Sequence, residues 1–133
     1  LRGVEAAPPW SHALRADAPR VIVVEPQAAP ALQASIKAGA CTFADGPDSI
    51  MGRLDCKEPS LIALNGLARD ADDFLTVNDE DVQSRLAQIA SADLATTASG
   101  GAGIAAAMMH DVQAALEIGP ESRILCFLSE VPE

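Results

Sequence analysis

The stretch Met51-Gly-Arg-Leu-Asp-Cys-Lys-Glu-Pro-Ser-Leu-Ile62 decides how this chain is interpreted. It places basic and acidic side chains, a cysteine and a proline between two apolar stretches, a mixture that neither a core nor a plain surface requires. The apolar run VIVVEP (21–26) lies upstream, and the glycine-rich run ASGGAGI (98–104) lies downstream. The order of these three segments is the main clue to fold and function.

Apolar, β-branched runs alternate with helical patterns along the chain. We predict strands at residues 21–25, 73–77 and 123–128, because each is a short apolar run bounded by turn or helix signals. The sequence 41–59 contains Asp-Gly-Pro and a further glycine, so we predict a loop with one helical turn near 49–53. The helices that we predict cover residues 9–15, 30–38, a segment starting at Ser60, a segment after Asn78, and 101–118.

Strands that alternate with helices indicate a parallel sheet covered by helices on both faces. The 133 residues and their 49% hydrophobic content fit one α/β domain, residues 1–133. In such sheets the carboxyl ends of the strands meet at one edge, where ligands bind. Glu25, which ends one predicted strand, and Ser129, which directly follows another, are therefore expected at that edge.

The three segments, with residues 21–129 around them, resemble the C-terminal half of a fold-type II (tryptophan synthase β-like) pyridoxal phosphate (PLP) enzyme, and within it diaminopropionate ammonia-lyase. The resemblance implies the C-terminal segment of a larger lyase, whose Schiff-base lysine lies in an N-terminal half before Leu1. The implied reaction removes the α-proton of an amino acid and expels its β-amino group as ammonia. The fragment alone is expected to be inactive and holds no catalytic residue.

The resemblance also implies which residues contact the cofactor. Ser129 takes the position that faces the pyridine nitrogen, while Ser99, Gly100 and Gly101 line the flank of the cofactor. Glu25 matches a glutamate that helps to bind a divalent cation in serine racemase-like relatives. The second carboxylate of that site is replaced here by Ala31, so we predict no metal and expect Glu25 to cap nearby backbone amides or to shape the site.

From the residues alone, plainer interpretations stay open. A serine at the end of a strand often makes a turn, and a glycine cluster at a helix start serves close packing as well as it serves an anion. The two lysines also have poor contexts for a catalytic amine, which needs a depressed pKa. Lys37 is expected at a helix C-terminus and Lys57 beside acids, and both surroundings favour the protonated amine.

Composition excludes several classes of function. A net charge of −10 and 3% aromatic residues disfavour nucleic-acid binding. No run of about eighteen apolar residues or signal peptide is present, so we expect a cytoplasmic protein without a membrane contact. Three cysteines, Cys41, Cys56 and Cys126, lack metal-ligand spacing and are expected to be reduced.

Two other functions remain as alternatives. The chain could be a stand-alone, non-catalytic α/β module that binds a small anion at Gly100–Gly103, or part of a threonine or serine dehydratase. For the lyase we expect a small amino-acid substrate. We also expect a homo-oligomer, because a sheet edge left open invites pairing with another copy.

Overall fold

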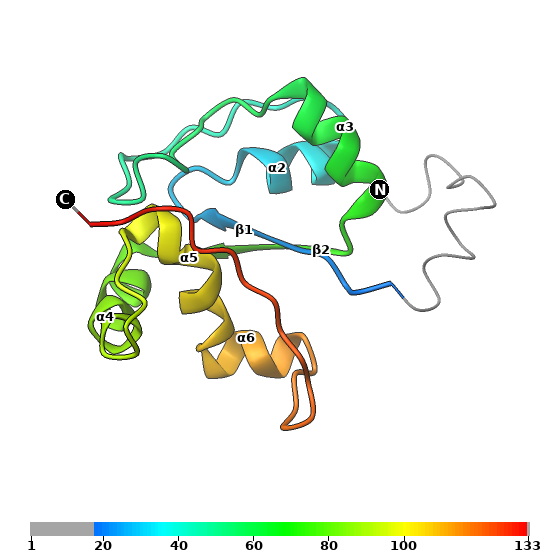
Figure 1. The fold of residues 1–133 in the computed structure, drawn as a ribbon. Coiled ribbons are helices and arrows are strands. Elements are labelled where there is room, and N and C mark those ends of the chain that lie inside the picture. The colour runs from blue at the N-terminus through cyan, green and yellow to red at the C-terminus, as the bar shows by residue number, and fades with distance from the viewer. Residues whose placement is uncertain (1–17, 133) are drawn as a thin grey trace.

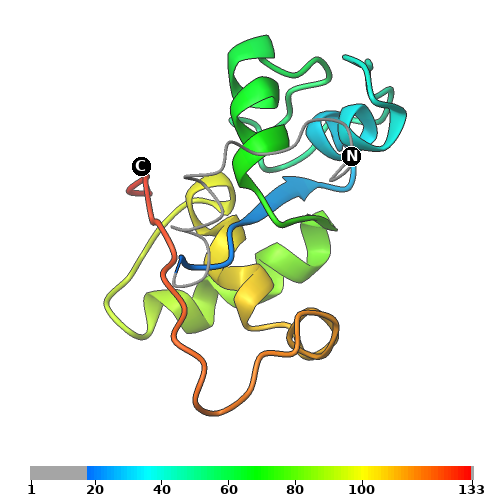
Figure 2. The same ribbon diagram turned by 90° about the vertical axis from the view of Figure 1, so that its right-hand side faces the viewer.

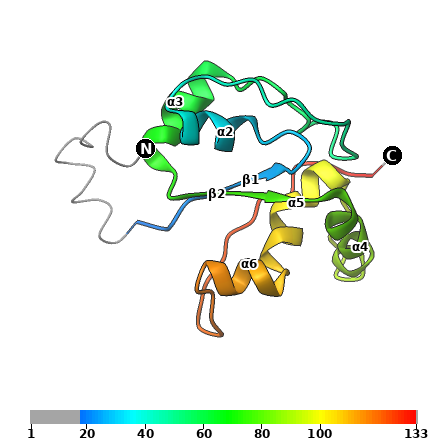
Figure 3. The same cartoon turned by 180° about the vertical axis from the view of Figure 1, so that it is seen from behind.

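The computed structural model describes residues 18–132, so the predicted helix 9–15 lies outside the described residues. A parallel sheet forms the middle layer, with α2 and α3 on one face and α4, α5 and α6 on the other (Figure 1). Seen from behind, the same three layers are evident (Figure 3). The predicted α/β class, with helices on both faces of a parallel sheet, is confirmed.

Two strands make up the sheet of the described residues. β1 (Ile22–Pro26) and β2 (Asp73–Val77) pair in parallel, with Ile22 opposite Asp73 and Pro26 opposite Val77. Both agree with the predicted runs to within one residue. Arg20 fastens the start of the sheet, since its guanidinium donates to both carboxylate oxygens of Asp73, at 2.5 and 2.9 Å. The carboxyl ends of β1 and β2 therefore lie at one edge.

The helices of the first layer begin and end where the sequence predicts. α2 (Ala31–Ala38) ends at Gly39, whose φ of 72° is the left-handed conformation that glycine adopts without strain. α3 (Leu61–Asp70) begins after Ser60, whose hydroxyl accepts the Ala63 amide. Only the middle of α3 is covered, because Leu64 is buried while Leu61 is 61% exposed.

On the other face, α4 (Asp79–Ala90) is capped by Asn78, which accepts the Asp81 amide at 2.7 Å. The single helix predicted at 101–118 is wrong. The structure divides it into α5 (Ala98–Ala107) and α6 (His110–Ala115). Met109 takes an extended conformation between them and is buried in the core, and the Gln113 side chain donates to the freed carbonyl of Ala107 at 2.8 Å.

The strand predicted at 123–128 is also wrong, because residues 123–128 form no ladder with the sheet. The segment nevertheless alternates as a strand does: Cys126 and Leu128 are partly covered, while Leu125 and Phe127 are each 81% exposed. Burial raises the pKa of the Cys126 thiol. This C-terminal segment, residues 123–131, runs from beyond α6 back to the start of α5 (Figure 2).

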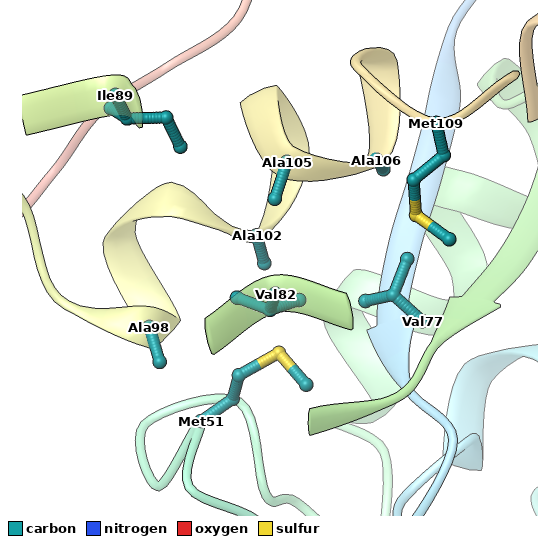
Figure 4. Packing of buried hydrophobic residues seen from close by; sticks show 9 residues of the cluster. All are labelled: Met51, Val77, Val82, Ile89, Ala98, Ala102, Ala105, Ala106 and Met109. Carbon is teal, nitrogen blue, oxygen red and sulfur yellow. The ribbon is translucent and has the colours of Figure 1, made fainter. Parts of the chain in front are cut away.

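The core lies between the sheet and the second helical layer. Met51 reaches into it from the loop before α3 and meets Val77 and Val82 (Figure 4). Alanines on α5, including Ala102 and Ala105, allow that helix to approach α4 closely. Among residues 18–132, no helix is long and apolar enough to cross a membrane.

Candidate functional site

A cleft of ≈ 560 Å³ opens where three segments meet. The segments are the loop 50–53, the start of α5 and the end of the C-terminal segment. The volume suits a small-molecule site, which typically measures about 300–1,000 Å³. The residues that line it are Ile50, Gly52, Arg53, Thr97, Ser99, Ser129, Glu130 and Val131.

The loop that forms one wall is held from both ends. Ser49 donates its hydroxyl to Asp79 at 2.6 Å, and the Ile50 amide donates to the other oxygen of the same carboxylate at 2.9 Å. At the next corner the Leu54 amide donates to the Met51 carbonyl, which closes a tight turn where a helical turn was expected. Hydrogen bonds therefore position this wall of the cleft.

Opposite this loop, Glu130 connects all three segments. Its Oε1 forms an ion pair with Arg53, 2.9 Å from Nε, and its Oε2 accepts a hydrogen bond from the hydroxyl of Thr97. Thr97 in turn caps α5, since its Oγ1 accepts the Gly100 amide at 3.0 Å. One carboxylate thus fixes the C-terminal segment against both the loop and the helix start.

Of the five residues predicted to contact the cofactor, the structure brings Ser99 and Ser129 to the cleft. Ser99 accepts the Arg53 amide at 3.1 Å, which leaves its hydroxyl proton free to donate. Ser129 is exposed, and its hydroxyl makes no hydrogen bond with residues 18–132. A neutral hydroxyl that is open to a cleft fits a heteroaromatic ring nitrogen, so this wall is compatible with the ring side of PLP.

The two predicted glycines lie behind the cleft and do not line it. A Cβ on Gly100 would be 3.0 Å from the Cβ of Glu130, and one on Gly101 would be 3.3 Å from Leu86 of α4. Both glycines therefore serve close packing around α5, as the plainer interpretation of the cluster proposed. A direct contact of either with the cofactor stays a prediction.

Glu25 is not among the residues that line the cleft. Its two carboxylate oxygens accept the amides of Leu32 and Gln33, each at 2.8 Å, so it anchors the start of α2. Burial raises the pKa of Glu25, and the two amide hydrogen bonds partly offset that rise. The prediction that Glu25 caps backbone amides is confirmed; the structure does not bring it to Ser129. Ala31, at the missing second carboxylate, is buried in α2.

Neither lysine reaches the cleft. The Lys57 ammonium donates to the Ala28 and Pro47 carbonyls and to Asp55, at 3.0, 2.6 and 2.5 Å, and so ties three loop segments together. Its hydrogen bond holds the pKa of Asp55 below the usual value. Lys37 donates to Gln33 on the exposed side of α2. Both amines make hydrogen bonds, and neither lysine is among the residues that line the cleft with Ser129.

Sequence reasoning missed Arg53 and Glu130 as site residues. The acid that directly follows Ser129 was a usable signal for Glu130, because neighbours in an extended segment lie close to the same edge. Thr97 was a second usable signal for the site, because threonine is a typical N-cap residue and its hydroxyl is therefore expected at the start of the helix. The pairing of Arg53 with Glu130 had no local signal.

Comparison with solved structures supports the fold. The chain aligns with a threonine deaminase from T.th. with a TM-score of 0.66 and 22% identity, covering 76% of this chain and 38% of that one. It aligns with maize serine racemase with a TM-score of 0.63 and 22% identity, covering 69% of this chain and 28% of that one. It also aligns with a fungal L-serine ammonia-lyase from Rhizomucor miehei, with a TM-score of 0.70 and 21% identity, covering 91% of this chain and 40% of that one. The chain thus spans well under half the length of each of these structures.

No curated protein matches the chain. Residues 9–130, by contrast, match the family described as pyridoxal-phosphate dependent enzyme, a region that includes every residue lining the cleft except Val131. Ser129, which we predict to face the cofactor ring, lies within the matched region. Matched over nearly its whole length, the chain belongs to the family of pyridoxal-phosphate dependent enzymes.

Proposed function

We propose that this chain is the C-terminal segment of a longer PLP-dependent amino-acid lyase that eliminates ammonia from 2,3-diaminopropionate. The observation that carries the proposal is the cleft itself, in which Ser129 presents a free hydroxyl between the Met51–Pro59 loop and the start of α5. The run MGRLDCKEPS in that loop favours the diaminopropionate branch.

In this proposal the residues of the chain bind and orient. PLP, when bound, supplies a ring that withdraws electrons from the substrate carbon that loses its proton. Ser129 donates a hydrogen bond to the ring nitrogen without adding charge. Ser99 offers a second donor, and Glu130 keeps Ser129 in position by its bonds to Arg53 and Thr97. The lysine that carries the cofactor belongs to the segment that we propose before Leu1.

A serine or threonine dehydratase is the second candidate. Threonine deaminase and L-serine ammonia-lyase are among the similar structures, and both share the fold of this chain. Their identities of 21–22% support the architecture and leave the leaving group open. The two candidates differ in the group expelled from the β-carbon, which is an amine in one and a hydroxyl in the other.

The decisive experiment is an assay of the longer enzyme with 2,3-diaminopropionate, serine and threonine as parallel substrates. We expect ammonia release to be fastest with diaminopropionate, and Ser129→Ala to lower kcat/KM by about tenfold, because one hydrogen bond to the ring is lost. Equal or faster turnover of serine or threonine would favour the dehydratase instead. With the 133-residue chain, PLP and borohydride should give no stoichiometric adduct on Lys37 or Lys57, and such an adduct would overturn the proposal.

We also propose that the isolated chain self-associates through its C-terminal segment. Leu125, Phe127 and Val131 are more than 80% exposed on the outward side of an extended segment that pairs with no strand among residues 18–132. Size-exclusion chromatography with light scattering should show a dimer or larger species, and Phe127→Lys should shift it toward the monomer. A wild-type chain that stays monomeric at high concentration would contradict this.

A further inference from the structure

The guanidinium of Arg53 keeps hydrogen-bond donors that its ion pair with Glu130 does not occupy. The shortest contact between Glu130 and Arg53 is at Nε, on the side of the guanidinium, and the two terminal amino groups make no hydrogen bond with residues 18–132. The end of a guanidinium, formed by those two groups, is the edge that binds a carboxylate through two parallel hydrogen bonds. Glu130 thus orients the group and leaves its end open.

Stability does not account for this arrangement. The Arg53 side chain is 79% exposed, and exposed ion pairs contribute about 0–1 kcal/mol. Glu130 already has a second partner in Thr97, so it does not need the arginine to fix the C-terminal segment. The guanidinium instead lies at the mouth of the cleft, among the residues that line it.

The hydrogen bonds within the cleft leave mainly donors unused. Both oxygens of Glu130 are occupied by Arg53 and Thr97, and Ser99 already accepts the Arg53 amide. What remains is the end of the guanidinium and the hydroxyl protons of Ser99 and Ser129. Arg53 is also the one cation among the described residues that line this cleft. Such a set of donors is complementary to an anion.

We propose that Arg53 is a specificity-determining residue that binds a carboxylate of the amino-acid substrate at the mouth of the cleft. The proposal rests on the proposed function for the identity of the ligand as an amino acid. A carboxylate in this place lies beside Ser99 and within the same cleft as Ser129. Arg53 therefore selects ligands by charge, while Ser129 addresses the cofactor ring.

The test is an NMR titration of the 133-residue chain at constant ionic strength. The probes are acetate (one carboxylate), succinate (two), inorganic phosphate and neutral acetamide. We expect acetate and succinate, and not acetamide, to shift the amide signals of Gly52, Arg53, Ser99 and Ser129 in a saturable way. Arg53→Gln should weaken binding at least about fivefold, while Arg53→Lys retains part of it, since it keeps the charge without the fork. The matched control is Arg69→Gln, which removes an exposed arginine on α3 and should change nothing.

Each outcome decides. Equal affinities for acetate and succinate support binding of the one carboxylate that 2,3-diaminopropionate carries. Succinate tighter than acetate would assign Arg53 to a second carboxylate, which this substrate lacks, and would overturn the inference in this form. A response to phosphate alone, unchanged binding in Arg53→Gln, or no response to any carboxylate overturns the proposal. In the longer enzyme, Arg53→Gln should raise KM about fivefold or more with little change in kcat. Because the titration needs no turnover, its failure leaves the elimination reaction untouched, and failed elimination with intact carboxylate binding refutes only the proposed reaction.

Discussion

Replacing Met51 by alanine is expected to lower the free energy of unfolding by about 2–5 kcal/mol. The side chain is fully buried, although it belongs to a loop, and it packs against Val77 and Val82 between the sheet and α4 (Figure 4). The truncation leaves a cavity that the neighbouring strand and helix cannot close without moving. Because Arg53 and Gly52 follow in the same tight turn, the cleft wall should loosen as well.

Urea denaturation followed by circular dichroism measures this change. Met51→Leu keeps nearly the same volume and should cost less than about 1.5 kcal/mol. Ile62→Ala is the matched control, because Ile62 is 87% exposed on α3 and its loss should stay within about 0.5 kcal/mol. If Met51→Ala were as mild as Ile62→Ala, the loop would not be fastened to the core through this residue.

The sequence predicted those parts of the fold that depend on neighbours along the chain. Ser60 and Asn78 cap their helices, and Gly39 ends α2 in the left-handed conformation, each where local spacing indicates. A cap needs only a side chain and an amide two or three residues away, so the sequence contains the whole interaction. The two strands were predictable for a similar reason, as continuous apolar runs between helices.

The predictions that were wrong concern segments whose structure depends on partners that are distant in the sequence. The run 123–128 has the composition of a strand and alternates like one, yet no strand among the described residues pairs with it. The break between α5 and α6 likewise follows from burying Met109, which the helical periodicity of 101–118 does not reveal. Burial and pairing are decided by the rest of the sheet, which a single segment does not encode.

The candidate site likewise contains one residue that the sequence predicted correctly and one whose position depends on a neighbouring helix. Ser129 was found by its resemblance and by its place after an apolar run, and the structure puts it in the cleft. Glu25, chosen by the same rule, anchors α2 instead, because the chain turns back and brings the amides of Leu32 and Gln33 over its carboxylate. A position at the end of a strand therefore predicts the edge of the sheet, and the next helix decides whether the side chain faces a ligand.

Replacing Gly100 by alanine is expected to lower the free energy of unfolding by about 1–3 kcal/mol and to disturb the cleft at the same time. The added Cβ would lie 2.5 Å from the Thr96 hydroxyl oxygen and 3.1 Å from the backbone nitrogen of Glu130. Thr96 is buried and β-branched, so its side chain has little freedom to turn aside. The Glu130 backbone can yield only if the C-terminal segment moves, and Ser129 moves with it.

The same helix offers the control that separates this clash from helix propensity. A Cβ on Gly103 would meet nothing within 4 Å, so Gly103→Ala should stabilise the chain by up to about 1 kcal/mol, as alanine does in an open helical position. Thermal unfolding compares the two variants, and the NMR signals of Ser129 and Glu130 should shift in Gly100→Ala alone. If both variants were stabilised alike and these signals stayed in place, the C-terminal segment would not rest on the start of α5.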